Sequence, residues 1–365
     1  KARPNQEGSN DLARSKANKG SKLKIIPLGG VDEIGKNMTV YEYEDDMIVV
    51  DCGSIFPQED MLGVDLVIPD TTYIEKNVSK LRGFLITHGH EDHIGATPYV
   101  FEKLKAPVYG TRLTLALVDH KLKERRVGGV DLRVIQPHDV VQLGNSFKVE
   151  FLHVNHSIAG AVAMAIHTPV GTVIHTGDFK IDYTPVDGEQ FDLGRMAQLG
   201  EEGVLALLCD STNVERPGYT MSERTVGATF ENLFHDAQGR IIIAMFASNI
   251  HRIQQVVDSA VRHNRKVCLC GRSMVNVSKV AMQLGDLLIP EGKLISIDDL
   301  DRYSDDEIVV ITTGSQGETM SGLTRMAFSE HKKLEIKESD MVIISATPIP
   351  GNEKSVSRVI NQLVR

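Results

Sequence analysis

The feature that most constrains this chain is a run of histidines and carboxylates directly after an apolar, strand-like stretch. Phe84-Leu85-Ile86 leads into the segment Thr87-His88-Gly89-His90-Glu91-Asp92-His93. Three imidazoles and two carboxylates so close together would cost too much free energy in a hydrophobic core. We therefore interpret the segment as a loop at a strand end, which either forms a solvated acidic surface or binds metal. Imidazole and carboxylate are donors that zinc and manganese accept.

The spacing inside this segment predicts a site for two cations rather than one. His88 and His90 are separated by one residue, so both side chains can face the same metal. Asp92 and His93 follow directly and can face a second metal, about 3.5–4 Å from the first in such sites. Paired cations of this kind activate water and stabilise both the attacking and the leaving oxygen of a displacement at phosphorus.

The chain divides into two parts that differ in their pattern of predicted strands and helices. From about 23 to 180, short β-rich runs separated by turn residues follow one another, with helical periodicity at 97–105 and 111–125. After about 204, apolar strand runs alternate with helical segments, which is typical of a parallel, doubly wound sheet. The expected pairs are 204–209 with 222–236, 241–246 with 249–263, 267–270 with 273–285, 308–312 with 320–329, and 342–345 with 353–364. The boundary is expected near 210–220.

Composition excludes some classes of protein. The net charge of −9 rules out a bulk nucleic-acid coat, although a local basic groove remains compatible with it. No apolar window approaches the roughly 18 residues of a transmembrane span. Residues 1–21 are basic and poor in apolar side chains, so we expect a disordered tail. Cys52, Cys209, Cys268 and Cys270 lie in or beside apolar runs, and we interpret them as small buried side chains in a reducing cytosol.

The histidine segment, together with the strand before it, resembles the signature of the metallo-β-lactamase superfamily. Asp51, His156 and Asp178 follow the order of that family. The resemblance implies an α/β fold, the αββα sandwich. It also implies three roles: the first metal is held by His88, His90, His156 and Asp178, the second by Asp92, His93 and Asp178, and Asp51 supports these ligands from behind. Taken alone, an aspartate at a strand end is more often a turn cap.

The second part narrows the resemblance to the β-CASP branch, and within it to the bacterial ribonuclease J family, over about residues 23–365. The segments that carry it are Pro27–Asn37, Leu208–Asn213, Phe246–Arg252, Gly271–Met274, Thr313–Glu318 and Pro348–Asn352. It implies a doubly wound α/β β-CASP domain inserted into the sandwich. The expected domains are the first part of a metallo-β-lactamase domain at 22–213 and a β-CASP domain at 214–365.

This resemblance also implies a function. It predicts a ribonuclease that hydrolyses RNA phosphodiester bonds, as a 5′-to-3′ exonuclease with endonuclease activity, in mRNA decay and rRNA maturation. The implied cofactors are two divalent metal ions, zinc in the first place and manganese as the alternative. The implied partners are single-stranded RNA, preferably 5′-monophosphorylated, and further copies of the chain in a dimer or tetramer. The protein would be cytoplasmic, without a membrane partner.

The resemblance assigns residues to these steps. It gives catalytic roles to Asp92, Asp178 and Asp210, and RNA 5′-phosphate binding to Gly314, Ser315, Gln316 and Gly317. From the residues alone, Asp210 is equally well explained as a cap at a strand end, and the glycine-rich loop as an ordinary strand–helix turn. In the family the chain continues beyond Arg365 with a further histidine motif and one more metal-ligating histidine, so we expect a fragment of a longer enzyme.

Three other functions are compatible with parts of the pattern. A small-molecule hydrolase of the same superfamily, such as a lactonase or thioesterase, would lack the alternating segment after 210. A non-catalytic RNA-binding subunit of a ribonuclease complex would typically have an eroded metal motif, whereas Asp92, His93 and Asp178 are all present. A DNA-directed β-CASP nuclease agrees less well with the segments Gly29–Asn37 and Gly314–Glu318.

Overall fold

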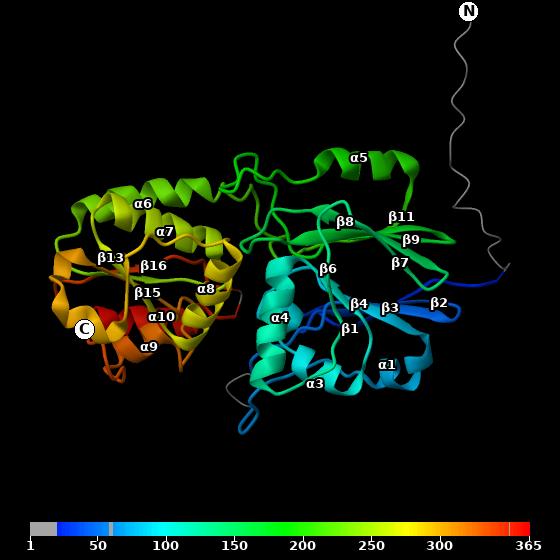
Figure 1. Ribbon diagram of the computed structural model, residues 1–365, viewed down its shortest axis with the longest axis horizontal. Coiled ribbons are helices and arrows are strands. Elements are labelled where there is room, and N and C mark those ends of the chain that lie inside the picture. The colour runs from blue at the N-terminus through cyan, green and yellow to red at the C-terminus, as the bar shows by residue number, and fades with distance from the viewer. Residues whose placement is uncertain (1–19, 58–60, 350) are drawn as a thin grey trace, which may run out of the picture. The chain divides into compact units, whose positions relative to one another are not determined.

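The computed structural model describes residues 20–57, 61–349 and 351–365, and these form two compact units (Figure 1). Of the described residues, the first unit comprises those up to His156, Gly160–Ile181 and Phe191–Gly218, and the second comprises those in Ser157–Ala159, Asp182–Gln190 and Tyr219–Arg365. The tail expected at 1–21 lies outside the described residues except for its last two. The expected domain boundary at 213/214 stays a prediction. Among the described helices, none is long and apolar enough to cross a membrane.

The first unit contains two sheets. The six-stranded sheet has the order β1-β2-β3-β4-β5-β6, and the five-stranded sheet has the order β11-β10-β9-β8-β7. The strands of the first are β1 (Lys24–Gly29), β2 (Met38–Tyr43), β3 (Asp46–Val50), β4 (Leu81–Leu85), β5 (Val108–Gly110) and β6 (Leu132–Val134). Those of the second are β7 (Val140–Leu143), β8 (Phe147–His153), β9 (Val162–Thr168), β10 (Gly171–His175) and β11 (Val204–Leu208).

Helices cover the outer faces of this sandwich, as Figure 1 shows. The helices of this unit are α1 (Thr72–Lys76), α2 (Glu91–Ile94), α3 (Thr97–Lys103), α4 (Arg112–Glu124) and α5 (Leu193–Glu202). Strand β8 shows why the layers form, because alternate residues of a strand face opposite sides. Phe147, Val149 and Phe151 pack between the two sheets, whereas Leu152 packs on the other side with Leu199 of α5. The αββα sandwich expected from the sequence is confirmed.

The second unit is a parallel sheet with helices on both faces. Its strand order is β14-β13-β15-β12-β16, and every strand pair in it is parallel. Figure 1 shows α6 and α7 on one face and α9 and α10 on the other. The strands are β12 (Ile241–Ala244), β13 (Lys266–Cys270), β14 (Leu294–Ile295), β15 (Ile308–Thr312) and β16 (Met341–Ile344). The helices are α6 (Arg224–Asp236), α7 (Ile250–Arg262), α8 (Arg272–Leu284), α9 (Gly322–Ala327) and α10 (Glu353–Leu363).

Local sequence explains these elements. All five residues of β15 are buried and all five are β-branched, as expected of a central strand covered on both faces. Helix α7 begins after Asn249, whose side chain accepts a hydrogen bond from the backbone N–H of Arg252. Its buried residues Ile250, Ile253 and Val257 recur at helical spacing. The doubly wound second unit predicted from the sequence is therefore present.

The interpretation of the cysteines was right for three and wrong for one. Cys52, Cys268 and Cys270 are buried, but Cys209 is exposed. Cys209 directly follows β11, which lies at the edge of its sheet. Leu205 and Leu207 of the same strand are also exposed, so the apolar run around Cys209 has one face that the described residues leave uncovered.

Candidate metal centre

The candidate centre lies at one edge of the first unit, where strands from both sheets end. β3 and β4 are parallel, so Asp51 and His88 emerge at the same edge of their sheet. β8 and β10 both run antiparallel to β9, so the loops with His156 and Asp178 also emerge together. Pairing of distant strands thus collects side chains from four loops at one place.

The short helix α2 is anchored by backbone hydrogen bonds from two neighbouring loops. Cys52 donates its N–H to the carbonyl of His93 at 2.8 Å, and Asn37 donates its N–H to the carbonyl of Asp92 at 2.9 Å. Gly53 packs so closely here that a Cβ atom would lie 1.6 Å from the Asp92 carbonyl oxygen. A side chain at position 53 would therefore displace the helix that carries Asp92 and His93.

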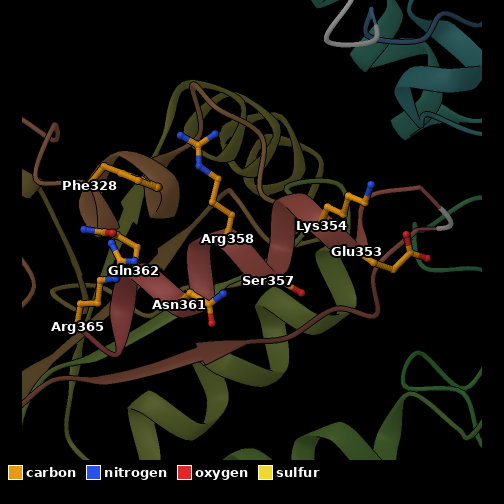
Figure 2. Close-up of a pocket in the computed structure, with 8 residues that line it drawn as sticks. All are labelled: Phe328, Glu353, Lys354, Ser357, Arg358, Asn361, Gln362 and Arg365. Atoms are coloured by element: carbon orange, nitrogen blue, oxygen red, sulfur yellow. The ribbon is translucent and has the colours of Figure 1, made fainter.

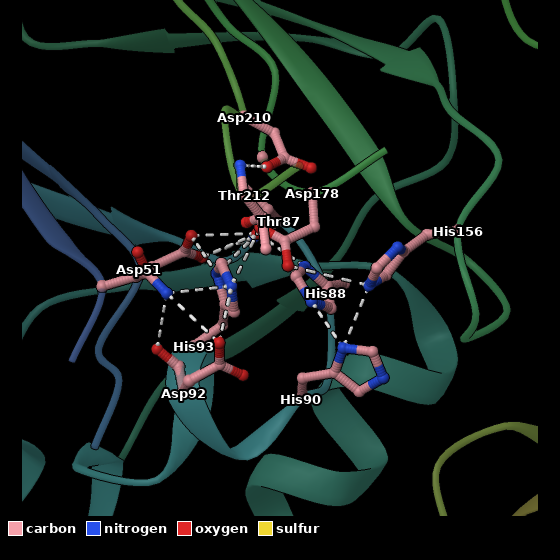
Figure 3. Close-up of polar contacts among 12 residues, drawn as sticks. Asp51, Thr87, His88, His90, Asp92, His93, His156, Asp178, Asp210 and Thr212 are labelled. Atoms are coloured by element: carbon pink, nitrogen blue, oxygen red, sulfur yellow. Dashed lines mark hydrogen bonds and ion pairs between the residues drawn. The ribbon is translucent and has the colours of Figure 1, made fainter. Parts of the chain in front are cut away.

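The first donor group comprises His88, His90, His156 and Asp178, whose candidate ligand atoms lie within 4.8 Å of one another. Nδ1 of His90 lies 3.0 Å from Nε2 of His88 and 3.0 Å from Nε2 of His156 (Figure 3). Oδ2 of Asp178 lies 3.8 Å from Nε2 of His156. Nitrogens bound about 2.0–2.1 Å from a tetrahedral zinc would be roughly 3.3 Å apart, so this donor set fits such a cation.

The second donor group comprises Asp92, His93 and Asp178. Nε2 of His93 lies 3.3 Å from Oδ1 of Asp178 and 3.6 Å from Oδ2 of Asp92. Asp178 thus turns one carboxylate oxygen to each group, which suits a residue placed between two cations. The structure brings together all six residues that the sequence analysis assigned to metal.

Electrostatics differ between the two groups. Burial, followed by the other histidines, holds the pKa of His88 well below its usual value, and burial lowers the pKa of His90 to about 3 and of His156 to about 4. These three imidazoles are therefore neutral and keep lone pairs for a cation. Burial alone would lower the pKa of His93, but the nearby carboxylates outweigh it and raise that pKa well above its usual value. The second group thus favours positive charge.

Asp51 lies behind both groups, and its supporting role stays a prediction. Its carboxylate contacts Nδ1 of His93 at 2.7 Å and accepts hydrogen bonds from the backbone N–H and hydroxyl of Thr87. Asp51 itself has a positive φ of 64°, which aspartate tolerates better than most residues. This strained turn directs the carboxylate under the loop that carries the histidines.

Two contacts were missed by the sequence analysis. Thr87 Oγ1 lies 3.0 Å from Nδ1 of His88, and Asn37 Nδ2 lies 3.1 Å from Nε2 of His93. Both residues lie in segments that the sequence analysis singled out, but nothing in their local sequence indicated these partners. The signal available was position: one residue directly precedes the first histidine, and the other ends a glycine-rich segment.

Asp210 lies just after β11 in the first unit and next to the loop of Asp178 (Figure 3). Its Oδ1 accepts the N–H of Thr212 at 2.9 Å, and its Oδ2 accepts the N–H of Phe179 at 3.5 Å. The side chain therefore caps its own turn and touches the residue after Asp178. Its catalytic role stays a prediction.

The loop expected to bind a 5′-phosphate follows β15 in the second unit. Ser315 is buried, and its hydroxyl has no hydrogen-bond partner among the described residues. Gln316 is also buried, and its side chain bonds to the backbone of Thr347 and Ile349 at 3.1 and 2.8 Å. Gln316 thus holds the following loop in place, whereas the phosphate-binding role of the segment stays a prediction.

A surface cavity of about 550 Å³ lies elsewhere in the second unit, along α10 (Figure 2). Its lining residues are Phe328, Glu353, Lys354, Ser357, Arg358, Asn361, Gln362 and Arg365. The lining has one carboxylate and no histidine or cysteine, and Arg358 stacks over the Phe328 ring at 5.1 Å. The cavity therefore lacks the donors of a hydrolytic metal site.

Comparison with known families matches both units. Residues 31–200 match the metallo-beta-lactamase superfamily, and residues 238–363 match the family described as "Ribonuclease J, beta-CASP domain". Ribonuclease J of Helicobacter pylori is 47% identical over 353 residues, which cover 95% of this chain and 51% of that protein. Ribonuclease J2 of Bacillus subtilis is 44% identical over 344 residues, covering 94% of this chain and 62% of that protein.

A solved structure shares the fold. A protein of unknown function from Enterococcus faecalis aligns with a TM-score of 0.62 at 15% identity, covering 94% of this chain and 92% of that one. The chain spans about half the length of the Helicobacter relative. From the two domain matches, the relatives and the convergence of the histidine segment with Asp51, His156 and Asp178, we conclude that this chain belongs to the metallo-β-lactamase superfamily, in its β-CASP branch of the ribonuclease J type.

Proposed function

We propose that this chain is the catalytic part of a metal-dependent ribonuclease that hydrolyses RNA phosphodiester bonds. The observation that carries the proposal is the pair of donor groups that share Asp178. Relatives named ribonuclease J over about 95% of the chain supply the substrate class. Divalent cations bound in such paired groups supply Lewis acidity for the attack of water on phosphorus and neutralise the charge that develops on the phosphate.

The chain's own residues have distinct tasks in this proposal. The neutral imidazoles of His88, His90 and His156 direct lone pairs at one point, which prepares the first group without a change of protonation. The carboxylates of Asp92 and Asp178 attract positive charge to the second group, and the same carboxylates raise the pKa of the neighbouring His93. Because the support beneath these residues is buried, the donors are already in place before substrate arrives.

In this proposal Asp210 assists the leaving group, and the loop after β15 binds the 5′ end of the RNA. Asp210, beside the Asp178 loop, helps the 3′-oxygen of the broken bond to leave. Gly314, Ser315, Gln316 and Gly317 hold the 5′-monophosphate of single-stranded RNA, and Ser315 contributes a hydroxyl that has no partner among the described residues. This pairing favours stepwise 5′-to-3′ exonuclease action besides endonuclease cleavage. We assign such activity to mRNA decay and rRNA maturation in the cytoplasm.

The proposed cofactors are two zinc ions, with manganese as the alternative that the same donors accept. We further propose a homo-oligomer, either a dimer or a tetramer. Elemental analysis of the purified protein tests the cofactor, with zinc expected at close to two ions per chain. Size measurement by light scattering in solution tests the assembly.

The decisive experiment compares cleavage of RNAs with a 5′-monophosphate and a 5′-triphosphate by the cation-loaded protein. We expect mononucleotide release from the monophosphorylated RNA, and loss of cleavage after chelation. RNA binding without cleavage by a protein with both cations would contradict the proposal and favour a non-catalytic RNA-binding subunit. Within the described residues the second group has only three donors. For this reason the experiment also tests the alternative of a non-catalytic RNA-binding subunit.

A further inference from the structure

Asp51 reaches histidines of both donor groups, by two different routes. Its Oδ2 contacts Nδ1 of His93 directly at 2.7 Å. The hydroxyl oxygen of Thr87 lies 3.0 and 2.9 Å from the two Asp51 oxygens, and the same oxygen lies 3.0 Å from Nδ1 of His88. Asp51 is therefore linked to His93 in the second group without an intermediate, and to His88 in the first group through Thr87.

The hydrogen bonds that link Asp51, Thr87 and His88 determine which atom carries each proton. An ionised carboxylate only accepts hydrogen bonds, so the Thr87 hydroxyl must give its single proton to Asp51. The remaining lone pairs of Thr87 Oγ1 can then only accept, so Nδ1 of His88 must carry a proton. A neutral imidazole with a proton on Nδ1 has its lone pair on Nε2. Nε2 is the atom of His88 that faces the first donor group, 3.0 Å from His90 Nδ1.

The opposite tautomer of His88 would remove one lone pair from the first donor group. With its proton on Nε2, His88 would direct an N–H at the point where the lone pairs of His90 and His156 converge. A cation at that point would meet a proton instead of a lone pair. The Thr87 hydroxyl therefore decides which of two equally charged forms of His88 is present.

Besides Asp51 and His88, the Thr87 hydroxyl oxygen has one more distant partner, Nδ1 of His93 at 3.4 Å, and that nitrogen lies closer to Asp51, at 2.7 Å. Thr87 and Asp51 are each 1% exposed and His88 is fully buried, so water does not compete for the hydroxyl. The backbone carbonyl of Thr87 accepts the N–H of Val162 at 3.0 Å, which ties it to the second sheet. A Cβ on Gly177 would lie 2.9 Å from the Thr87 Cβ, so the side chain is enclosed from that direction too. A β-branched side chain also has few rotamers.

We propose that Thr87 is a positioning residue, which transmits the hydrogen-bonding of Asp51 to His88 and so sets the affinity of the first donor group for a divalent cation. The inference rests on the cation-binding part of the proposed function and not on RNA as the substrate. Groups that orient a metal-bound histidine in this way typically change metal affinity by about 10–100-fold when they are removed.

The experiment measures cation affinity in the purified, cation-free protein by competition with a chromophoric chelator. Thr87→Val keeps the shape and removes the hydroxyl, whereas Thr87→Ser keeps the hydroxyl. Thr97→Val is the matched control, because Thr97 is equally buried and its hydroxyl donates only to the Ile94 carbonyl. Variants His90→Ala and Asp92→Ala identify which binding step belongs to which group.

We expect Thr87→Val to weaken binding at the first group by about 10–100-fold and to leave the second group within about threefold. Thr87→Ser should restore the wild-type affinity, and Thr97→Val should not alter it. Asp51→Asn should weaken both groups, since it breaks both routes. The visible absorption bands of bound cobalt(II) should change with Thr87→Val and return with Thr87→Ser.

Three results would overturn the inference: unchanged affinity in Thr87→Val, an equal loss at both groups, or no rescue by serine. If Thr87→Val does not fold by circular dichroism, Thr87→Ala takes its place with the same expectation. A wild-type protein that binds no cation would overturn the metal centre as well. Cation binding with the expected variant pattern but no RNA cleavage would overturn only the proposed ribonuclease function.

Discussion

His90 occupies the middle of the first donor group, because its Nδ1 lies 3.0 Å from nitrogens of two other histidines. His90 is partly exposed, whereas His88 and His93 of the same segment are 0% and 2% exposed. A change at His90 can therefore test metal binding with little effect on the packing of the fold.

Replacement of His90 by alanine should therefore abolish RNA cleavage and keep the fold. Loss of a supporting group already costs about 10–100-fold in affinity or activity, so loss of a ligand should cost at least about 100-fold. The unfolding free energy should change by less than about 1 kcal/mol. Cleavage assays and thermal denaturation measure both, with the exposed His235→Ala as the control. Cleavage at the wild-type rate in His90→Ala would remove the metal assignment.

Glu42 illustrates a charged residue with a structural role. Its side chain is 3% exposed and accepts hydrogen bonds from Lys24, Tyr73 and Lys80. Burial alone would raise its pKa, but these partners outweigh burial and lower the pKa from 4.5 to about 2. Because the pKa is lower in the folded state, ionised Glu42 stabilises the protein above about pH 4.5, and this stabilisation is lost as the pH falls towards 2.

Glu42→Gln should therefore lower the unfolding free energy at pH 7 by about 1–3 kcal/mol. The difference from the wild type should narrow between pH 4.5 and 2, since both proteins are then neutral at this position. Urea unfolding at several pH values measures it, and Glu102→Gln at an exposed position is the control. A difference that stays constant down to pH 2 would show that Glu42 acts through packing alone.

Among the elements, α2 depends on the loop after β3. Four residues long, it cannot be stable on its own, because isolated helices need at least about 12 residues. The backbone of Cys52 and the packing of Gly53 against Asp92 hold it in place. The position of Asp92 and His93 is thus a consequence of a neighbouring loop rather than of the helix itself.

Gly53→Ala should disturb the second donor group more than a typical surface mutation. The new Cβ would overlap the Asp92 carbonyl, so α2 must move, and we expect a loss of about 2–4 kcal/mol together with weaker binding of the second cation. Differential scanning calorimetry and cation titration measure these effects. Gly128→Ala is the control, since a Cβ at Gly128 has no neighbour within 4 Å. A variant with wild-type stability and two tightly bound cations would contradict this dependence.

The loop after β15 separates a structural residue from a candidate binding residue. Gln316→Ala should destabilise the protein by about 1–3 kcal/mol and expose the amide of Ile349 to hydrogen exchange, because three hydrogen bonds are lost.

Ser315→Ala should be nearly neutral for folding, since its hydroxyl has no partner among the described residues. It should instead weaken the preference for 5′-monophosphate ends more than internal cleavage. Equal loss of both activities would limit the loop to a structural role.

At the scale of the whole molecule, cation binding concerns one unit only. All six candidate ligands and Asp51 belong to the first unit, whereas the second unit is a separate parallel sheet with its own core. A ligand that binds only the folded state stabilises the part that holds it, by RT ln(1 + [L]/Kd).

Chelation should therefore loosen the first unit selectively. We expect faster hydrogen exchange in β4 and β10, which end at the metal centre, and little change in β12 and β15. Mass spectrometry of peptic peptides with and without EDTA measures this, and zinc added back should reverse it. Equal loss of protection in both units would contradict a centre confined to the first.

Much of the second unit and the metal segment could be predicted from the sequence. Strand β15 lies at 308–312 as predicted, and helices α6, α7 and α8 agree with their predicted ranges to within two residues. Helix α5 was not predicted. The apolar side chains of α5 indicate a helix only once its packing partner is known. That partner is the outer face of β8 and β9, against which Leu199 packs. Cys209 was misjudged for a related reason, since an apolar run does not reveal which of its faces stays uncovered.

The sequence by itself determined which donor atoms this protein has, because His88, His90, Asp92 and His93 lie within one short segment of the chain and local spacing places them. It also determined the alternating second unit, whose periodicity is a local property. Only the tertiary structure decided how Asp51, His156 and Asp178 complete the two groups, and that Thr87 and Asn37 contact their histidines. These contacts depend on strand pairing between residues far apart in the chain, and hydrogen-bond partners are chosen by that pairing rather than by neighbours in sequence.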